Sequence, residues 1–424
     1  MSDLEQLDRA VMWHPFTQMA TWEPLVISAG EGNYLLDHAG RRYLDGVSSL
    51  WCNLHGHRHP RLDRALRDQL DRIAHSTFLG LTHEPAVRLG AALLEAAPRG
   101  LARVFYSDSG ATAVEIALKQ SFQYWQLTGR PAKQRFLRLD EAYHGDTLGA
   151  VGVGGIELFH RIFGPLLVRS VAIPSPAGSD GRVALEALEH QLAGRAAELA
   201  ALVLEPLVQG AAGMLVHPRG FLSRAAELCR RHGVHLIVDE VATGFGRTGT
   251  LFACEQEGVS PDFLCLAKGI SGGYLPLAAT LTTEDIYAAF LGEQHELKQF
   301  FHGHTYTANP LACAVGLESL ALLRESTLAN ARTQIPGFTA ALARIARLPG
   351  VRSIRQCGLM AGIDLTPRPP RHLGIEVCAR VRSHGVILRP LGDLVVWMPP
   401  LTIEPGDLEL LERATTAALR ETLG

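Results

Sequence analysis

The chain has 424 residues, of which 47% are hydrophobic and 20% charged, and its formal net charge is −3. This length predicts two domains, or one large domain with an appendage. The balanced charge gives no electrostatic reason to expect a nucleic acid or an anionic membrane as partner. No apolar run approaches the ~18 residues of a membrane span, and the first residues lack the apolar core of a signal peptide. Seven cysteines without a CxxC pair indicate reduced thiols. We therefore expect a cytoplasmic protein.

The first predicted strand and helix lie within residues 103–125. Residues 103–107 (RVFYS) are short, apolar and β-prone. The helix that follows carries apolar side chains at three- to four-residue spacing, namely Val114, Leu118, Phe122 and Trp125. Ser109, Gly110 and Ala111 stand where this helix begins. The free N–H groups and positive dipole of a helix N-terminus suit a phosphate group, and an ordinary serine N-cap is the alternative interpretation.

Further apolar strands alternate with helical stretches. A strand-like stretch leads into Tyr143-His144-Gly145-Asp146, where a tyrosine suits stacking on a flat cofactor or is an ordinary loop aromatic. Short apolar runs follow at residues 201–204, 235–239 and 262–267, and residues 221–231 predict a helix. This alternation predicts an α/β fold with a mainly parallel central sheet flanked by helices.

The pattern changes after about residue 330. Strands are expected near residues 354–365 and 385–397, and a helix near 407–423. We therefore predict three parts: an N-terminal segment, a large domain and a smaller C-terminal α/β domain, at residues 1–45, 46–330 and 331–424.

Lys268 and Asp239 are the strongest candidates for chemistry. The chain has four lysines, and Lys119, Lys133 and Lys298 stand in polar or helix-surface contexts, whereas Lys268 ends an apolar strand. A desolvated amine there suits nucleophilic attack on an aldehyde, while a lysine that reaches out to water is the alternative. Asp239 ends another apolar strand, and one strand–helix–strand unit would bring it beside Lys268. A buried carboxylate needs a cationic partner, such as a protonated pyridine nitrogen, and a turn-capping aspartate is the alternative.

At this point the residues resemble a family. The motifs SDSGA, YHGDT, LVLEPLVQG, VDEVATGFGRTG, CLAKGISGGYLP and HTYTANPLACA, in this order, are similar to those of the class III aminotransferases of fold type I. The resemblance covers nearly the whole chain. It implies pyridoxal 5′-phosphate as cofactor, held by Lys268 as a Schiff base, and a homodimer whose subunits share their active sites.

The resemblance also implies roles for single residues. Lys268, Asp239 and Tyr143 would be catalytic, with Asp239 on the pyridine nitrogen, Val241 beneath the ring and Tyr143 stacked above it. The phosphate would lie on Ser109, Gly110 and Ala111, and on His304 and Thr305 of the neighbouring subunit. The predicted substrate contacts, in addition to Tyr143 and Lys268, are Phe16, Leu50, Trp51, Asp146, Arg247, Gly303 and Arg389.

Three further motifs, WHPFTQM, SSLWCNLHGH and RPLGD, resemble the branch of the class that acts in biotin biosynthesis. That likeness implies transfer of an amino group to 8-amino-7-oxononanoate, with S-adenosylmethionine as the donor. Phe16 stands where many members carry a tyrosine, and Leu50 stands where many carry a tryptophan. With these two residues the sequence resembles members that use lysine as donor. The alternatives are another ω-aminotransferase, acting on ornithine, a γ-amino acid or a diamine, and a cofactor-binding protein without catalysis.

Other motif matches carry less weight. GFGRTG matches a dinucleotide fingerprint, and GISGG matches a nucleophile elbow, but neither is followed by a helical pattern. His55, His57 and His59 alternate as metal ligands can, but no carboxylate or cysteine stands at ligand spacing. We therefore expect no nicotinamide cofactor, no serine hydrolase and no metal site.

Overall fold

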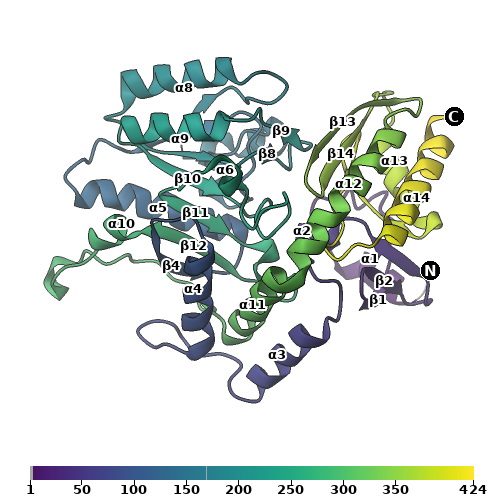
Figure 1. The fold of residues 1–424 in the computed structure, drawn as a ribbon, viewed down its shortest axis with the longest axis horizontal. Helices are drawn as coiled ribbons and strands as arrows, with labels where there is room; N and C mark the ends of the chain where they lie inside the picture. The colour runs from purple at the N-terminus through teal and green to yellow at the C-terminus, as the bar shows by residue number, and fades with distance from the viewer. Residues whose placement is uncertain (1–2, 169) are drawn as a thin grey trace.

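The computed structural model describes residues 3–168 and 170–424. Its centre is a seven-stranded sheet (Figure 1). In spatial order the strands are β4 (Leu101–Ser107), β12 (Ala278–Thr283), β11 (Phe263–Leu266), β10 (His235–Asp239), β7 (Leu199–Leu204), β5 (Arg135–Leu139) and β6 (Ser170–Ile173). The five strands from β11 to β6 are parallel, and β12 runs antiparallel to both its neighbours. The predicted mainly parallel α/β sheet is confirmed, with β12 as an unpredicted reversal.

Successive residues of the central strands face opposite layers of helices, as the two-residue period of a strand requires. In β7, Leu202 and Leu204 belong to the core that includes α8 (Arg182–Arg195) and α9 (Phe221–Arg231). Ala201 and Val203 pack instead with α5 (Gly110–Leu127). Both faces of the strand are therefore apolar, which is why the strand reads as a continuous hydrophobic run.

Smaller elements surround this sheet. The helices are α1 (Asp3–Val11), α2 (Ser48–Trp51), α3 (Pro60–Leu70), α4 (Glu84–Ala96), α6 (Leu148–Gly152), α7 (Glu157–His160), α10 (Glu284–Ala288) and α11 (Pro310–Leu322). Strands β8 (Val208–Gln209) and β9 (Leu215–Val216) form a short hairpin. The connection from β10 to β11 holds only a 3₁₀ helix, Ala253–Glu257, where a full helix was expected.

The C-terminal elements form a second layered unit, at the right of Figure 1. Its sheet has the order β13 (Val351–Cys357), β14 (Met360–Leu365), β17 (Leu394–Trp397) and β16 (Arg389–Leu391). The helices α12 (Leu328–Ile345), α13 (Leu373–Arg380) and α14 (Pro405–Leu423) accompany it. Strand β15 (Val386–Ile387) instead extends the N-terminal sheet of β1 (Ile27–Glu31), β2 (Tyr34–Asp37) and β3 (Arg42–Asp45). The two ends of the sequence are thus joined by strand pairing.

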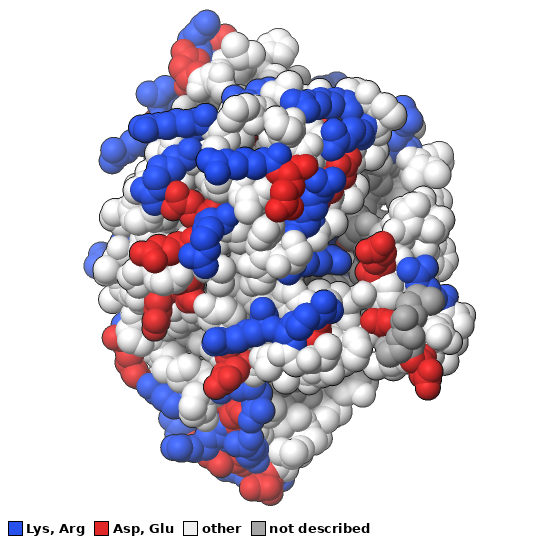
Figure 2. Space-filling model, turned by 90° about the vertical axis from the view of Figure 1, so that its right-hand side faces the viewer, with Lys and Arg blue, Asp and Glu red and all other residues white. Residues whose placement is uncertain are grey.

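The surface carries charges of both signs. Figure 2 shows the face that lies at the right of Figure 1, and on it basic and acidic side chains are intermingled. In the C-terminal unit Arg344 pairs with Glu412, and Arg371 with Glu376. Within the described part of the chain, no helix has the length and apolar character that crossing a membrane requires.

Two side chains differ from their predicted environment. Phe122 in α5 was expected on the buried face, but it is 37% exposed, while Val114, Leu118 and Trp125 are buried. Lys133 was expected in a polar context, but it is buried. Its Nζ donates to the backbone oxygens of Ala196, Leu199 and Gly233, at 2.6, 2.9 and 2.9 Å.

Lys133 holds together the loops that precede three parallel strands. The carbonyl of Ala196 lies just before β7, that of Leu199 belongs to the first residue of β7, and that of Gly233 lies just before β10. Lys133 itself lies just before β5. Its amine also lies 4.5 Å from the ring centroid of Trp125. Burial, helped by Arg130, lowers the pKa of Lys133 to about 8. The amine is therefore still mainly protonated at neutral pH and can donate all three hydrogen bonds.

We predict that Lys133→Met destabilises the protein by roughly 2–4 kcal/mol, because it leaves buried carbonyl oxygens without donors. Chemical or thermal unfolding followed by circular dichroism measures this loss. Lys298→Met is the matched control, because Lys298 is half-exposed and its amine pairs with Glu296 at the surface, an interaction worth about 1 kcal/mol or less. Equal stability of the two variants would contradict the assigned role of Lys133.

Candidate active site

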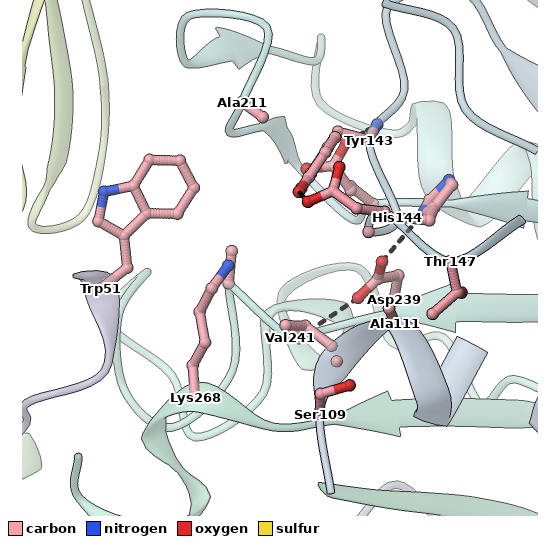
Figure 3. Close-up of a pocket in the computed structure, with 15 residues that line it drawn as sticks. Trp51, Ser109, Ala111, Tyr143, His144, Thr147, Ala211, Asp239, Val241 and Lys268 are labelled. Atoms are coloured by element: carbon pink, nitrogen blue, oxygen red, sulfur yellow. Dashed lines mark hydrogen bonds and ion pairs between the residues drawn. The ribbon is translucent and has the colours of Figure 1, made fainter. Parts of the chain in front are cut away.

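A cavity of about 440 Å³ lies at the carboxyl ends of the central strands. Figure 3 shows Lys268 rising into it, between Trp51 on one side and Asp239 on the other. Ligands of such sheets bind at this edge. The lining residues are Trp51, Ser109, Gly110, Ala111, Tyr143, His144, Gly145, Asp146, Thr147, Glu205, Ala211, Asp239, Val241, Ala242 and Lys268.

Lys268 follows β11 at the start of a short 3₁₀ turn. Its backbone has φ = 43°, a left-handed conformation that is unfavourable for residues other than glycine. Its Nζ lies 4.7 Å from the ring centroid of Trp51. Desolvation lowers the pKa of Lys268, and the nearby carboxyl groups of Asp239 and Glu205 partly oppose this effect. The fraction of neutral, nucleophilic amine is thereby increased over that of an exposed lysine.

Asp239 ends β10 and is buried. In the parallel register it lies opposite Cys265 of β11, three residues before Lys268. Its Oδ2 accepts a hydrogen bond from His144 Nδ1 at 2.7 Å, and its Oδ1 accepts one from the N–H of Val241 at 3.0 Å (Figure 3). The geometry therefore fixes a carboxylate at the cavity wall, where a protonated ring nitrogen would offset its desolvation.

The N-terminus of α5 forms another wall. Ser109 is the N-cap and forms a capping box with Thr112. The first N–H groups of the helix have no partner within it, which leaves those of Gly110 and Ala111 for a ligand. A Cβ on Gly110 would lie 2.5 Å from Cγ1 of Val241. Gly145 has φ = 118°, and a Cβ there would lie 2.4 Å from Cβ of Ala111. Glycine at both positions keeps this cradle open.

Tyr143 and Asp146 lie at the mouth of the cavity. The Tyr143 hydroxyl donates to Asp146 Oδ2 at 2.8 Å, and burial, followed by this bond, raises the pKa of Tyr143. The backbone N–H of Tyr143 donates to Glu205 Oε2 at 3.2 Å. Glu205 Oε1 accepts from the N–H of Gly210 at 2.9 Å.

Sequence reasoning missed Glu205 and His144 as residues of the site. Desolvation raises the pKa of Glu205 to about 7, so its charge is poised to change near neutral pH. Glu205 directly follows β7, as Asp239 ends β10. The rule that polar side chains at carboxyl strand ends gather at one edge would have identified it. His144 was visible only as a neighbour of Tyr143, and its bond to Asp239 spans 95 residues of sequence.

A strained turn carries two more predicted residues. In α2, Ser48, Ser49 and Trp51 all have positive φ values, of 51°, 62° and 65°. Trp51 is buried and lines the cavity, whereas Leu50 is 49% exposed. Such strain is common where a backbone shapes a binding site.

Phe16 and Arg389 lie near each other, beyond the immediate lining. Phe16 is 60% exposed and makes an edge contact with Phe159. The Arg389 guanidinium carbon lies 6.0 Å from the Phe16 ring centroid. Burial lowers the pKa of Arg389, and Tyr143, followed by Cys378, partly opposes this effect. Arg389 is thus within electrostatic reach of the cavity through Tyr143.

Arg247 does not lie where a substrate contact was predicted. Its side chain is buried and donates to Ser48 Oγ at 3.0 Å and to the carbonyl of Pro399. Burial lowers its pKa to about 10. The guanidinium is hydrogen-bonded within its own chain, and Arg247 is not among the residues that line the cavity.

Gly303, His304 and Thr305 also lie apart from the cavity of their own chain. They belong to the segment 299–307, which has no helix or strand, and Gly303 and Thr305 are exposed. His304 Nδ1 lies 2.7 Å from Asp108 Oδ2.

Comparison with known proteins gives the family. Residues 17–419 match the model of the class III aminotransferases. An adenosylmethionine-8-amino-7-oxononanoate aminotransferase of Nitratidesulfovibrio vulgaris is 52% identical over 98% of this chain and 81% of its own length. The enzyme of that name from Geobacter sulfurreducens is 49% identical, covering 96% of this chain and 95% of its own.

Solved structures agree. The crystal structure of the enzyme of that name from Methanocaldococcus jannaschii matches with a TM-score of 0.96 and 41% identity, over 99% of both chains. An amine transaminase from a Pseudomonas species, in its PLP-bound form, matches with a TM-score of 0.91 and 36% identity, over 97% of this chain and 99% of that one. The chain belongs to the class III aminotransferases, and its cofactor is pyridoxal 5′-phosphate.

The residues present fit this cofactor. The desolvated Lys268 amine suits the aldehyde, the buried Asp239 suits a protonated pyridine nitrogen, and the open cradle at Gly110 suits a phosphate. When bound, the cofactor supplies the electron sink that amino-group transfer requires.

We predict that Gly110→Ala weakens cofactor binding by at least about tenfold, because the added methyl group enters the space of Val241 and displaces the cradle. Titration of the apoprotein with pyridoxal phosphate, followed by absorbance, measures the affinity. Gly194→Ala is the control, since a Cβ there meets no atom within 4 Å. Unchanged affinity in Gly110→Ala would place the phosphate elsewhere.

Proposed function

We propose that this chain transfers an amino group to the ketone of 8-amino-7-oxononanoate, which yields 7,8-diaminononanoate in biotin biosynthesis. S-adenosylmethionine is the proposed donor. The main support is the name shared by relatives 47–52% identical over nearly the whole chain. The convergence of Lys268, Asp239 and the α5 N-terminus on one cavity supplies the chemistry that such a reaction needs.

In this proposal each residue has a defined task. Lys268 holds the cofactor and then moves a proton to and from the substrate carbon that bears the amino group. Asp239, held by His144 and the Val241 N–H, binds the pyridine nitrogen. Val241 supports one face of the ring and Tyr143 covers the other.

The remaining residues bind substrate and exclude water. The N–H groups of Gly110 and Ala111, with Ser109 as their cap, bind the phosphate. Arg389 binds the substrate carboxylate with two parallel hydrogen bonds. Trp51, Phe16 and Leu50 provide apolar contact area, and Asp146 acts through its hydrogen bond to Tyr143.

We further propose a homodimer in which Gly303, His304 and Thr305 complete the partner's site. The segment 299–307 is exposed and lies outside the cavity of its own chain. The segment carries Phe301, which is 68% exposed, and Leu79, which lies against Gly303, is 78% exposed. A second apolar hollow of about 400 Å³ lies along α5 and includes Phe122. Exposed apolar surface of this extent is typical of protein–protein contacts.

A second candidate function is that of an ω-aminotransferase for other amines. Several ω-transaminases share the fold, with TM-scores of 0.93–0.94 at 28–30% identity. Phe16 and Leu50 are exposed and are not among the residues that line the cavity, so the amino donor is identified by direct assay.

We predict that Lys268→Ala lowers the rate of amino transfer by several orders of magnitude, because the variant loses both the covalent link and the proton carrier. Borohydride reduction of the loaded wild type, followed by peptide mass spectrometry, should find the cofactor on Lys268. Lys298→Ala, at the surface, is the control and keeps full activity. A cofactor adduct on another lysine would contradict the assignment.

The donor is identified by mixing the loaded protein with one amine at a time, without an acceptor. We expect S-adenosylmethionine to remove the absorbance of the bound cofactor, because the amino group passes to it. A response to lysine alone would leave 8-amino-7-oxononanoate as the proposed acceptor, with lysine instead of S-adenosylmethionine as the donor. A response only to ornithine, a γ-amino acid or a diamine would favour the second candidate function.

A further inference from the structure

Four side chains outside the cavity form a continuous chain of hydrogen bonds. Lys119 Nζ lies 2.9 Å from His302 Nδ1, His302 Nε2 lies 3.2 Å from His304 Nε2, and His304 Nδ1 lies 2.7 Å from Asp108 Oδ2. Lys119 belongs to α5, and Asp108 lies between β4 and α5. The two histidines belong to the segment 299–307, so this relay ties that segment to α5 at Lys119 and to the residue before its N-cap at Asp108.

The chemistry of the end groups fixes the direction of the relay. An ammonium group only donates hydrogen bonds, and a carboxylate only accepts them. His302 Nδ1 must therefore accept from Lys119, which leaves the proton of His302 on Nε2. That proton is donated to His304 Nε2, and the proton of His304 then lies on Nδ1, facing Asp108. Each imidazole is neutral and carries one proton in a fixed position.

An additional proton on either ring breaks this arrangement. On His302 it would face the Lys119 ammonium, and on His304 it would face the N–H of His302. Burial, then Lys119 and His304, lower the pKa of His302, while Glu115 of α5 opposes them. Glu115 itself accepts from the N–H groups of Gly149 and Ala150. The remaining neighbours of the His302 ring, Phe300 and Phe105, do not titrate.

The relay also leaves His304 no means to bind a phosphate directly. Both of its ring nitrogens are engaged, and its backbone N–H donates to Thr307 Oγ1 at 3.0 Å. The next residue, Thr305, is exposed, and among the described residues nothing hydrogen-bonds its N–H or its hydroxyl. At the other end, Asp108 directly precedes Ser109, Gly110 and Ala111.

We propose that His304 is a positioning residue rather than a phosphate ligand: the neutral Lys119–His302–His304–Asp108 relay holds Thr305 ready for the phosphate in the partner subunit, and acid disrupts it. This inference rests on the proposed homodimer. The relay also connects the N-terminus of α5, where each subunit binds its own phosphate, to the segment 299–307, which serves the partner's site. Asp108 makes this connection. Because an added proton on either ring would face another donor, the contribution of the relay is present at alkaline pH and is lost as the pH falls.

The test compares pyridoxal phosphate affinity at about pH 8 and about pH 5.5 in apoprotein titrations, a range that spans imidazole protonation. The double variant His302→Gln and His304→Gln keeps a donor and an acceptor at each position but cannot titrate. We expect the double variant to bind pyridoxal phosphate as tightly as the wild type at the higher pH. Between the two pH values, the fold-loss of affinity should be about ten times smaller in the double variant than in the wild type. His295→Gln, an exposed histidine nearby, is the control and should follow the wild type.

Two further variants separate the roles of His304 and Thr305. His304→Leu breaks the relay and should weaken binding at both pH values, and Thr305→Ala should do the same by removing the phosphate contact. An identical acid loss in the wild type and the double glutamine variant would overturn the proposal, as would unchanged affinity in His304→Leu. Light scattering on the same samples measures the subunit number, so a monomer would refute the homodimer, whereas a dimer with unaltered pH dependence would refute the relay alone.

Discussion

The parallel pairing of β10 with β11 is the constraint on which the site depends. This register ends both strands at the same edge of the sheet, so a carboxylate and an amine emerge side by side. Asp239 is buried there, and a buried carboxylate is costly unless donors surround it. His144 and one backbone N–H supply two of those donors. In the proposed function, a cationic ring nitrogen would supply the remaining partner of this buried carboxylate.

The same edge gathers complementary groups from other strands. β7 delivers Glu205, and β4 leads into the free N–H groups of α5. Desolvation moves the pKa values of Lys268 and Glu205 in opposite directions, and in each case toward the neutral form. A cavity that disfavours isolated charge strengthens every hydrogen bond within it. Preorganised polar groups of this kind are what amino-group transfer on a bound cofactor requires.

The sequence predicted the elements whose signal is local. The helix Phe221–Arg231 and the strand His235–Asp239 have the predicted bounds, because apolar periodicity and length decide both. Features set by distant partners were not predictable in this way. Arg247 bonds to Ser48, 199 residues away, and to Pro399, 152 residues away. Lys133 meets carbonyls of two chain segments, 63 to 66 and 100 residues away. Neither set of partners has a sequence pattern, so the sequence could not show that Lys133 and Arg247 are both buried.

The most direct test of the central claim is a crystal structure of the protein with its cofactor bound. The account predicts a continuous bond from Lys268 Nζ to the cofactor, the ring nitrogen within hydrogen-bond distance of Asp239, and the phosphate on the N–H groups of Gly110 and Ala111. A cofactor turned so that its ring nitrogen points away from Asp239, or one bound outside this cavity, would contradict it.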